Sequence, residues 1–510
     1  MTSALPVPSL TRTRTRTARP SASLNRVSHP EWLFSVLALL VSPLSFLADT
    51  GNEIAIVIGT LVLLTALQLI AAVRQSLQSG VMGRPLLLGS LLIAFYGEAF
   101  VSSLQNPAFR MPFEAPVGFD QFPISLVRMG LVYVALFQLA TLAGYSLRFR
   151  RAARIFNVAN RQDRNPGIVR IALYLLAACA WVPLIASYGL DFRTISHVLL
   201  SSRHAVSDVA GSDAGLLVNF SSLSLFGSAA LLAKVLFSRS PLRLLDLVVA
   251  FIGIVPTIAS GTRYRLLYVF IPLLVIAFGR LVARRQYRRL TLIAVGGMLM
   301  LMLFQAQIAV RRVGWNHFFE MKSDTFLALK PTLQFDSLLF AIYLVPRHHP
   351  YFMEPMTPYF FTHWIPRSLW PNKPISKAFE YYDATWTRGA KLKVFNVTPS
   401  IMGEYHLNWG VFGVPMIGLW IGFLLYLSDE CMLRANVMRP CLAAVSIGMV
   451  YAFILASLRD YAPVYFVHVA LGAVAMCFLT RRASISAPEV CFDAPNAKLR
   501  GLVSKTVSKI

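Results

Sequence analysis

Long apolar runs, separated by short polar connections, dominate the chain. A helix that crosses a bilayer needs about 20 mostly apolar residues, and about twelve segments meet that criterion. They span residues 32–48, 54–73, 85–104, 123–146, 168–189, 215–236, 244–260, 266–283, 290–310, 409–428, 440–458 and 464–480. This pattern predicts an all-α polytopic membrane protein with about twelve transmembrane helices.

One long interval, residues 311–408, separates the ninth and tenth runs. A loop of that length without structure of its own would be unusual unless it is functional. Its apolar stretch 332–345 lies between Pro331 and Pro346 and is too short to span a bilayer. It therefore suits a re-entrant or interfacial helix. The predicted divisions are a disordered basic tail (1–31), nine helices (32–310), the partly helical loop (311–408), three helices (409–480) and a disordered tail (481–510).

Composition excludes most soluble classes. The chain is 56% hydrophobic and 14% charged, whereas soluble domains are about 45–50% apolar and about 25% charged. This apolar surplus cannot be hidden in a water-soluble core. The five cysteines are Cys179, Cys431, Cys441, Cys477 and Cys491. Their spacing fits no metal site, and none falls in a segment predicted to lie outside the cytoplasm, so we expect no disulfide framework.

The net charge of +25, from 48 Lys and Arg against 23 Asp and Glu, is a balance that can indicate nucleic acid. Its placement argues otherwise. Arginines gather in the N-terminal tail and in the connections after the fourth and eighth runs, namely Arg12, Arg14, Arg16, Arg19, Arg26, Arg148, Arg150, Arg151, Arg154, Arg161, Arg164, Arg280, Arg284, Arg285, Arg288 and Arg289. Connection 49–53 has no positive residue and 105–122 has only Arg110. The bias predicts cytoplasmic termini, a 311–408 loop on the outside and no nucleic-acid partner.

The first thirty residues leave two interpretations open. Their Thr-Arg repeats, serines, prolines and lack of acids match an organellar transit peptide, but a disordered cytoplasmic tail is the plainer interpretation. No cleavable signal sequence is predicted. The long loop is also ambiguous, because its Lys and Arg residues suit either an anionic substrate or an ordinary translocated domain. Its tryptophans suit either stacking on sugars or an interfacial belt.

Three segments carry a family resemblance. They are His363-Trp-Ile-Pro-Arg-Ser-Leu-Trp-Pro-Asn-Lys-Pro374, Thr398-Pro-Ser-Ile-Met-Gly-Glu-Tyr-His-Leu-Asn-Trp-Gly410 followed by Gly413, and Ser260-Gly-Thr-Arg-Tyr-Arg265. Together they resemble the Wzy-type O-antigen polymerases, the oligosaccharide repeat-unit polymerases of bacterial surface polysaccharide synthesis. The resemblance covers the helix-loop plan and is sharp only over about residues 360–415.

The resemblance implies a GT-C-like glycosyltransferase in the bacterial inner membrane. Such an enzyme transfers the growing glycan from undecaprenyl pyrophosphate to a lipid-linked repeat unit at the periplasmic face, without a nucleotide sugar, cofactor or metal. Its partners would be these lipid-linked oligosaccharides, membrane lipids and a polysaccharide chain-length regulator. An O-antigen ligase needs the same arginine-rich site, and only the Pro-Arg…Trp-Pro…Lys-Pro segment favours the polymerase. A transporter is disfavoured because the halves show no repeat and the charges gather at the outer surface.

The departing pyrophosphate requires fixed cations near the outer leaflet. We expect Arg263, with Arg367 and Lys373, to hold it, although Arg263 and Arg265 also suit lipid snorkelling. The expected substrate-binding set is Arg128, Arg263, Arg265, His363, Arg367, Trp370, Lys373 and Tyr405. Arg128 lies about one to two turns below the outer surface, and its alternative role is an ion pair with Glu98.

The acceptor hydroxyl requires a general base. The candidates are Asp336, His363, Glu404 and His406, and we expect Glu404 and His406 to form the catalytic pair. Thr398 as cap and Pro399 at the first helical position predict a helix on which Glu404 and Asn408 share a face. The alternatives are that His406 has only a structural role and that Glu404 only stabilises the helix N-terminus through its charge. Gly418 and Gly422 predict close helix packing in the next span.

Overall fold

The computed structural model describes residues 27–48, 50–105, 123–147, 161–163, 166–200, 214–238, 242–259, 263–313, 334–355, 357–362, 365, 370, 372–374, 376–389, 398–435, 442–458 and 462–482. All of them fall within one unit, Leu24–Arg482. The described chain is helical except for two three-residue strands, β1 (Arg161–Asp163) and β2 (Thr480–Arg482), which pair antiparallel.

The N-terminal helices begin at local capping signals. The Ser28 side chain accepts a hydrogen bond from the backbone nitrogen of Glu31, and the Thr50 side chain accepts one from that of Glu53. Each glutamate side chain in turn accepts a hydrogen bond from the backbone nitrogen of the capping residue. These capping boxes satisfy donors that would otherwise lack partners. The elements are α1 (His29–Val41), η1 (Ser42–Phe46), α2 (Gly51–Ser79), α3 (Gly83–Leu91), the π-helical η2 (Leu92–Gly97), α4 (Glu98–Gln105) and α5 (Ile124–Ser146).

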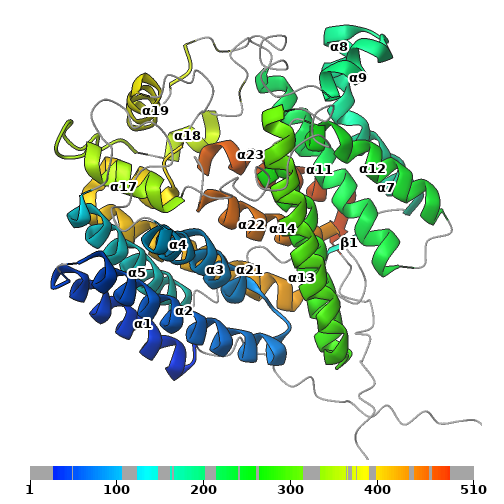
Figure 1. Cartoon of the computed structure of the whole chain (residues 1–510). Coiled ribbons are helices and arrows are strands. Elements are labelled where there is room, and N and C mark those ends of the chain that lie inside the picture. The colour runs from blue at the N-terminus through cyan, green and yellow to red at the C-terminus, as the bar shows by residue number, and fades with distance from the viewer. Residues whose placement is uncertain are drawn as a thin grey trace, which may run out of the picture. The chain divides into compact units, whose positions relative to one another are not determined.

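The remaining elements form a middle group, a loop group and a C-terminal group (Figure 1). The middle group is α7 (Pro166–Ala178), η4 (Cys179–Trp181), α8 (Val182–Tyr188), α9 (Phe192–Leu200), α11 (Ala214–Phe237), α12 (Arg243–Ala259), α13 (Arg263–Ala283), η6 (Tyr287–Arg289) and α14 (Leu290–Val313). The loop group is α17 (Gln334–Leu344), α18 (Thr357–Thr362) and α19 (Lys377–Gly389). The C-terminal group is α20 (Ile401–Trp409), η7 (Gly410–Phe412), α21 (Gly413–Arg434), α22 (Leu442–Ser457) and α23 (Ala462–Leu479).

The helices confirm a multi-pass, all-α membrane protein. Among the described residues, seven helical stretches are long and apolar enough to cross a bilayer: His29–Phe46, Gly51–Ser79, Gly83–Leu104, Ile124–Ser146, Pro166–Ile185, Arg265–Ala283 and Ile401–Arg434. The other five apolar runs also lie in helices, namely α11, α12, α14, α22 and α23. That these five also cross, giving about twelve spans, stays a prediction.

Contacts between helices agree with the predicted alternation of direction. Ends predicted to lie inside meet one another: Glu31 with Arg84, Tyr145 with Asp429, Arg170 with Asp246, and Phe237 with Arg280. Ends predicted to lie outside also meet: Ala48 with Arg128, Glu98 with Phe335, and Ser222 with His468. The contacts therefore sort the helix ends into two sides, and only the loop charges indicate which side is cytoplasmic.

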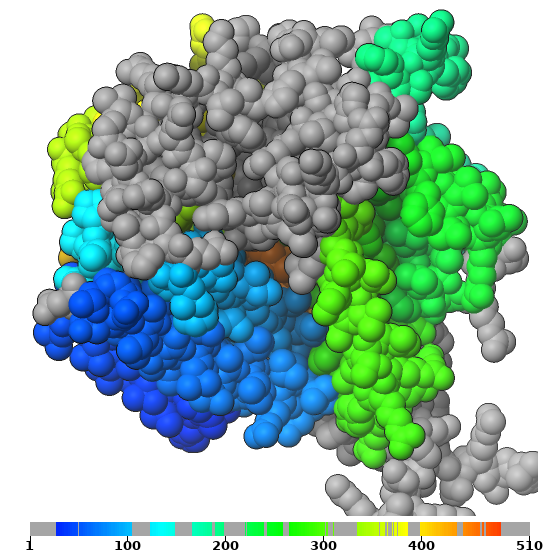
Figure 2. All heavy atoms as spheres, in the orientation of Figure 1, coloured from blue at the N-terminus to red at the C-terminus, as the bar shows by residue number. Residues whose placement is uncertain are grey.

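Helices α5 and α21 run parallel in close contact. A Cβ atom at Gly418 would lie 2.8 Å from the Ala140 Cβ, and one at Gly422 would lie 2.7 Å from the Tyr145 nitrogen. The close packing predicted for these glycines is confirmed. By contrast, α14 exposes Leu292, Val295, Met298, Leu299 and Met302, and Figure 2 shows it lying along this face of the molecule. An apolar face of this kind suits contact with lipid.

The helix predicted within 332–345 is present as α17. Ten of its eleven residues are buried, including Asp336 at 7% exposure. It packs against α5, because a Cβ atom at Gly130 would lie 3.2 Å from the Phe335 ring. Whether α17 enters the bilayer stays a prediction.

Candidate functional site

His406 lies at the centre of a buried cluster on the predicted outer side. Its Nε2 atom is 3.0 Å from the carbonyl oxygen of Val345. The ring centre lies 5.3 Å from the Tyr133 ring and 6.0 Å from the Tyr351 ring. Because a carbonyl only accepts, the Nε2 atom must carry the proton. When the ring is neutral, its lone pair is therefore on Nδ1, the form that a general base needs. We call Tyr133, Val345, Tyr351 and His406 the His406 cluster.

Helix α20 carries both Glu404 and His406, and because they are two residues apart their side chains leave the helix in different directions. The prediction that Thr398 caps the helix is wrong: the cap is Ser400, whose hydroxyl accepts from the Gly403 nitrogen at 3.2 Å. The Thr398 carbonyl instead accepts from the Ser337 hydroxyl of α17 at 2.8 Å. This tertiary contact keeps residue 398 out of the capping position. Glu404 is 0% exposed and His406 2%.

Helix α20 ends at Trp409, and η7 separates it from α21. Gly410 adopts a φ of +62°, a conformation that side-chain-bearing residues rarely take. A Cβ atom there would lie 2.8 Å from the Tyr351 ring. The break allows Tyr351 to cover His406 before α21 begins. Asn408 shares a face with Glu404 as predicted, and its amide donates to the Glu404 carbonyl oxygen at 3.0 Å.

Helix α17 fixes the carbonyl group that orients His406. The Phe335 nitrogen donates to Glu98 Oε2 at 3.2 Å, which anchors the first turn of α17 to α4. Ala341 packs against Gly403 of α20, where a Cβ atom would lie 3.1 Å from the Ala341 Cβ. The Tyr382 hydroxyl donates to the Ser337 carbonyl oxygen at 3.1 Å, and burial raises the pKa of Tyr382. The phenol therefore stays protonated as a donor.

Glu354 joins α20 to the segment that carries Lys373. Its nitrogen donates to Asn408 Oδ1 at 3.1 Å. Its carboxylate accepts from the Lys377 nitrogen at 2.9 Å and from the Ser376 hydroxyl at 3.2 Å, at the start of α19. A carboxylate at a helix N-terminus is favourable because backbone donors point at it. The α19 start is thereby tied to the helix that carries His406.

Tyr359 of α18 completes this connection. Its hydroxyl hydrogen-bonds to Glu354, and burial together with the Glu354 charge raises the pKa of Tyr359. The phenol therefore remains a proton donor to the carboxylate at neutral pH. Glu354 thus contacts residues of α18, α19 and α20.

The other predicted substrate residues fall in several places. The Lys373 ammonium donates to the Ile365 carbonyl oxygen at 2.8 Å, and Trp370 is 40% exposed. Tyr405 is a half-buried neighbour of Glu404 on α20. His363 and Arg367 lie outside the described residues, as do the chain segments predicted to be disordered tails, except for a few residues at their inner ends.

The two predicted arginines whose side chains are described, Arg128 and Arg265, contact different elements. Arg128 donates to the Ala48 carbonyl oxygen in the connection between η1 and α2, while the Glu98 carboxylate accepts from α17. Tyr133 is five positions after Arg128 on α5, so the two side chains point about 140° apart around the helix. Arg263 opens α13, and its side chain lies outside the described part. Arg265 interacts electrostatically with His468 of α23.

Another polar cluster, not predicted from the sequence, lies at the predicted inner side. Asp429 accepts hydrogen bonds from the hydroxyls of Tyr145 at 2.7 Å and Tyr451 at 2.5 Å and from the Gly83 nitrogen at 3.2 Å. Arg84 contacts both Glu31 carboxylate oxygens, at 2.7 and 2.8 Å. We call these residues the Asp429 network.

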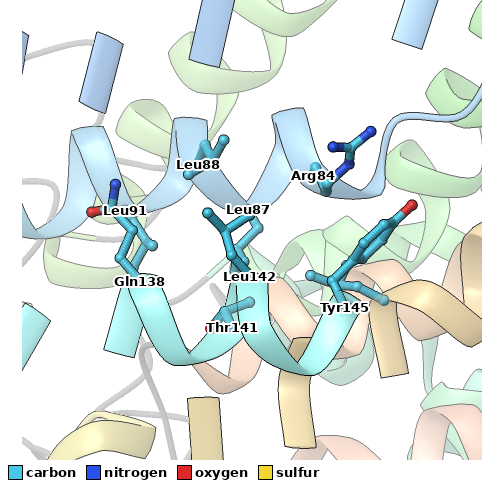
Figure 3. A pocket seen from close by; sticks show the side chains of 9 residues that line it. Arg84, Leu87, Leu88, Leu91, Gln138, Thr141, Leu142 and Tyr145 are labelled. Atoms are coloured by element: carbon cyan, nitrogen blue, oxygen red, sulfur yellow. The ribbon is translucent and has the colours of Figure 1, made fainter. Parts of the chain in front are cut away.

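This network corrects the statement that charges gather at the outer surface. Glu31 and Asp429 are 0% and 1% exposed and Arg84 is 5% exposed, so buried charge also lies at the inner ends. The Arg84 guanidinium lies 4.9 Å from the centre of the Tyr145 ring. Figure 3 shows both side chains at one end of a small apolar pocket, with Gln138 at the other end. The sequence does contain a signal for this network: two acids, Glu31 and Asp429, and the basic Arg84 lie at helix ends predicted to share one side.

Comparison with known proteins adds no assignment: no family model, no curated protein and no solved structure matches this chain.

Proposed function

We propose that this protein polymerises the repeat units of a bacterial surface polysaccharide at the periplasmic face of the inner membrane. The growing glycan passes from undecaprenyl pyrophosphate to a lipid-linked repeat unit. The observation that carries the proposal is the His406–Val345 contact, because it holds the ring in the tautomer of a base. This histidine stands within the segment that resembles the repeat-unit polymerases.

The reaction requires four changes that balance. The acceptor hydroxyl gives its proton to His406 Nδ1, and its oxygen forms a bond to the anomeric carbon of the donor sugar. The bond from that carbon to the pyrophosphate oxygen breaks, and the pyrophosphate leaves with the electron pair. Arg367, Lys373, Arg263 and Arg265 supply the positive charge that stabilises it. Glu404, two residues before the base on α20, orients the acceptor.

The burial of His406 adds a requirement. The Tyr351 ring and Gly410 cover the cluster, so an acceptor sugar reaches Nδ1 only when the segment around Tyr351 moves. Such a movement excludes water from the donor until both substrates are present, which protects the activated sugar from hydrolysis.

The test is the length distribution of surface and lipid-linked glycan in a host deleted for this gene and complemented with wild type, His406→Ala or Glu404→Gln. Single repeat units in the deletion strain, restored to polymer by wild type only, support the proposal. Long polymer that persists on the lipid carrier indicates a ligase instead. Polymerisation by both variants at normal expression contradicts the assigned catalytic pair.

Transport of a lipid-linked oligosaccharide is the second candidate, and the Asp429 network favours it. Ionisable residues buried within membrane helices often mark transport pathways. In the same deletion strain, transport predicts that no glycan at all reaches the outer face. A periplasmic pool of single repeat units would contradict it.

A further inference from the structure

Four exposed arginines lie in the connection between α13 and α14, at the predicted inner side. They are Arg284, Arg285, Arg288 and Arg289, and we call them the α13–α14 arginines. No acidic residue occurs between Asp246 and Glu320 in the sequence. No carboxylate of the described residues forms an ion pair with any of the four. Their charge is therefore not neutralised within the described part of the protein.

Backbone hydrogen bonds fix the conformation of this connection. The Gln286 nitrogen donates to the Leu281 carbonyl oxygen at 2.9 Å. The Arg285 nitrogen donates to the Val282 carbonyl oxygen, also at 2.9 Å. This is the Schellman pattern that ends many helices, and its central residue is usually glycine because φ is positive there. Here that residue is Arg285, with a φ of +55°. An arginine thus occupies a position at which the backbone favours glycine.

Arg288 and Arg289 stand against a second local preference. They directly precede Leu290, the first residue of α14. Cations are unfavourable at a helix N-terminus, because the free backbone donors already give that end positive charge. No acidic residue lies in the first turn of α14 to offset them. Topology explains why positive charge lies in this connection, but it requires neither these positions nor the strained turn. A bound anion offsets both.

An exposed apolar stripe on α14 begins directly after these arginines. Its residues are all more than half exposed, and they are Leu292, Val295, Met298, Leu299 and Met302. At 1.5 Å per residue the stripe is about 15 Å long, which is the depth of one leaflet of a hydrocarbon core about 30 Å thick. Nothing lies within 4 Å of a Cβ atom at Gly296 or Gly297. The stripe, on the outside of the molecule (Figure 2), thus matches the depth of a lipid chain in the inner leaflet.

A second copy of this chain is a poor occupant of the stripe. Copies in one membrane share one orientation, so a symmetric contact along α14 would bring both sets of α13–α14 arginines together at the same depth. These like charges would repel, with no carboxylate of the described residues paired to either set. A lipid with an anionic headgroup fits both features, because its phosphate meets the arginines while its chains cover the stripe.

We infer that the α13–α14 arginines and the α14 stripe together bind an anionic glycerophospholipid of the inner leaflet. The guanidinium groups donate hydrogen bonds to the phosphate in a planar fork that matches its oxygens. The acyl chains cover the face of α14 that the described helices leave open. This site lies on the predicted side opposite the His406 cluster, and the inference does not depend on the proposed function.

Native mass spectrometry of the purified full-length protein measures both the bound lipid and the number of copies. The probes are dioleoyl phosphatidylglycerol, dioleoyl phosphatidylethanolamine and glycerol 3-phosphate, which separate the headgroup charge from the acyl chains. We expect wild type to bind phosphatidylglycerol at least about tenfold more tightly than phosphatidylethanolamine. Glycerol 3-phosphate lacks the chains and is expected to bind more weakly than phosphatidylglycerol. Equal affinity for these two would indicate a site for free phosphate and overturn the inference.

Arg285→Gly is the sharpest variant. Glycine suits the φ of +55°, so the turn is preserved while one guanidinium is removed. We expect the preference for phosphatidylglycerol to fall about fivefold, as the loss of one cation near an anionic lipid surface implies, with no loss of melting temperature. Replacing all four α13–α14 arginines with glutamine is expected to abolish the preference. An unchanged preference in both variants overturns the inference.

The matched control removes the same charge from another cytoplasmic segment predicted by the sequence. It replaces four arginines of the N-terminal tail with glutamine, namely Arg12, Arg14, Arg16 and Arg19. We expect this variant to keep the full preference. If it loses the preference as completely as the α13–α14 variant, net charge alone attracts the lipid and the site is overturned. A wild-type protein without the preference also overturns it, as does a dimer that Gly296→Val dissociates.

Discussion

The Nε2 atom of His406 donates its proton to the carbonyl oxygen of Val345, 3.0 Å away, and so joins α20 to the end of α17. Because this contact fixes the tautomer, the His406→Gln variant separates the orientation of the side chain from its ability to accept a proton. The glutamine amide can still donate to Val345 but cannot accept a proton. We expect a folded protein whose polymerisation rate falls by at least about 100-fold, measured as repeat units added per minute by purified protein. Tyr133→Phe keeps the neighbouring ring and is expected to retain activity; equal loss in both variants would assign the effect to packing.

Removing the acceptor of the Asp429 network is expected to destabilise the protein. Asp429→Leu leaves two buried tyrosine hydroxyls and the Gly83 nitrogen without their acceptor, at a cost of about 1–3 kcal/mol for each donor. Asp429→Asn keeps one carbonyl oxygen and is expected to lose less. Thermal unfolding of both variants in the same detergent measures the difference. Equal melting temperatures for Asp429→Leu and wild type would show that the network contributes nothing to stability.

The Arg84–Glu31 pair gives a sharper comparison. Arg84→Leu alone leaves Glu31 buried without its cation, which is expected to cost about 3–5 kcal/mol. The double variant Arg84→Leu with Glu31→Leu removes both charges, and we expect it to be more stable than the single variant. Denaturant unfolding of the two variants and wild type provides the measurement. If the double variant is the least stable of the three, the cost of Arg84→Leu does not come from leaving the Glu31 charge unpaired.

The α5–α21 contact is expected to tolerate no side chain at its glycines. Gly418→Val places methyl groups where only 2.8 Å separates a Cβ atom from Ala140, and the two helices must then separate. We expect lower expression and a lower melting temperature. Gly296→Val in α14 is the control, because nothing lies within 4 Å of a Cβ atom there. Similar losses in both variants would mean that valine is harmful in any of these helices, whatever the contact.

Local pattern predicts the helices, but not how they meet. The apolar runs place every long helix, since about 20 apolar residues and the flanking polar residues are properties of a single segment. The sequence does not predict the correct cap of α20, because the Thr398 carbonyl oxygen accepts a hydrogen bond from Ser337, sixty-one residues earlier in the chain. Glu404, Tyr405 and His406 follow one another in sequence, so their place on one helix is predictable from the sequence. The Asp429 network is not predictable in this way, because its residues come from α1, α3, α5, α21 and α22, and no pattern within one helix identifies such partners.

The parallel packing of α5 and α21 also has a consequence for how the protein is made. Tyr145 and its acceptor Asp429 are 284 residues apart in sequence. Ribosomes add about 5–20 residues per second, so roughly 14 to 57 seconds pass between synthesis of the two. During that interval α5 presents its glycine-lined face and the Tyr145 hydroxyl to lipid or to an insertion factor. The last fifth of the chain must reach the membrane before this helix acquires its permanent neighbour, and a protein truncated before α21 would leave that surface open.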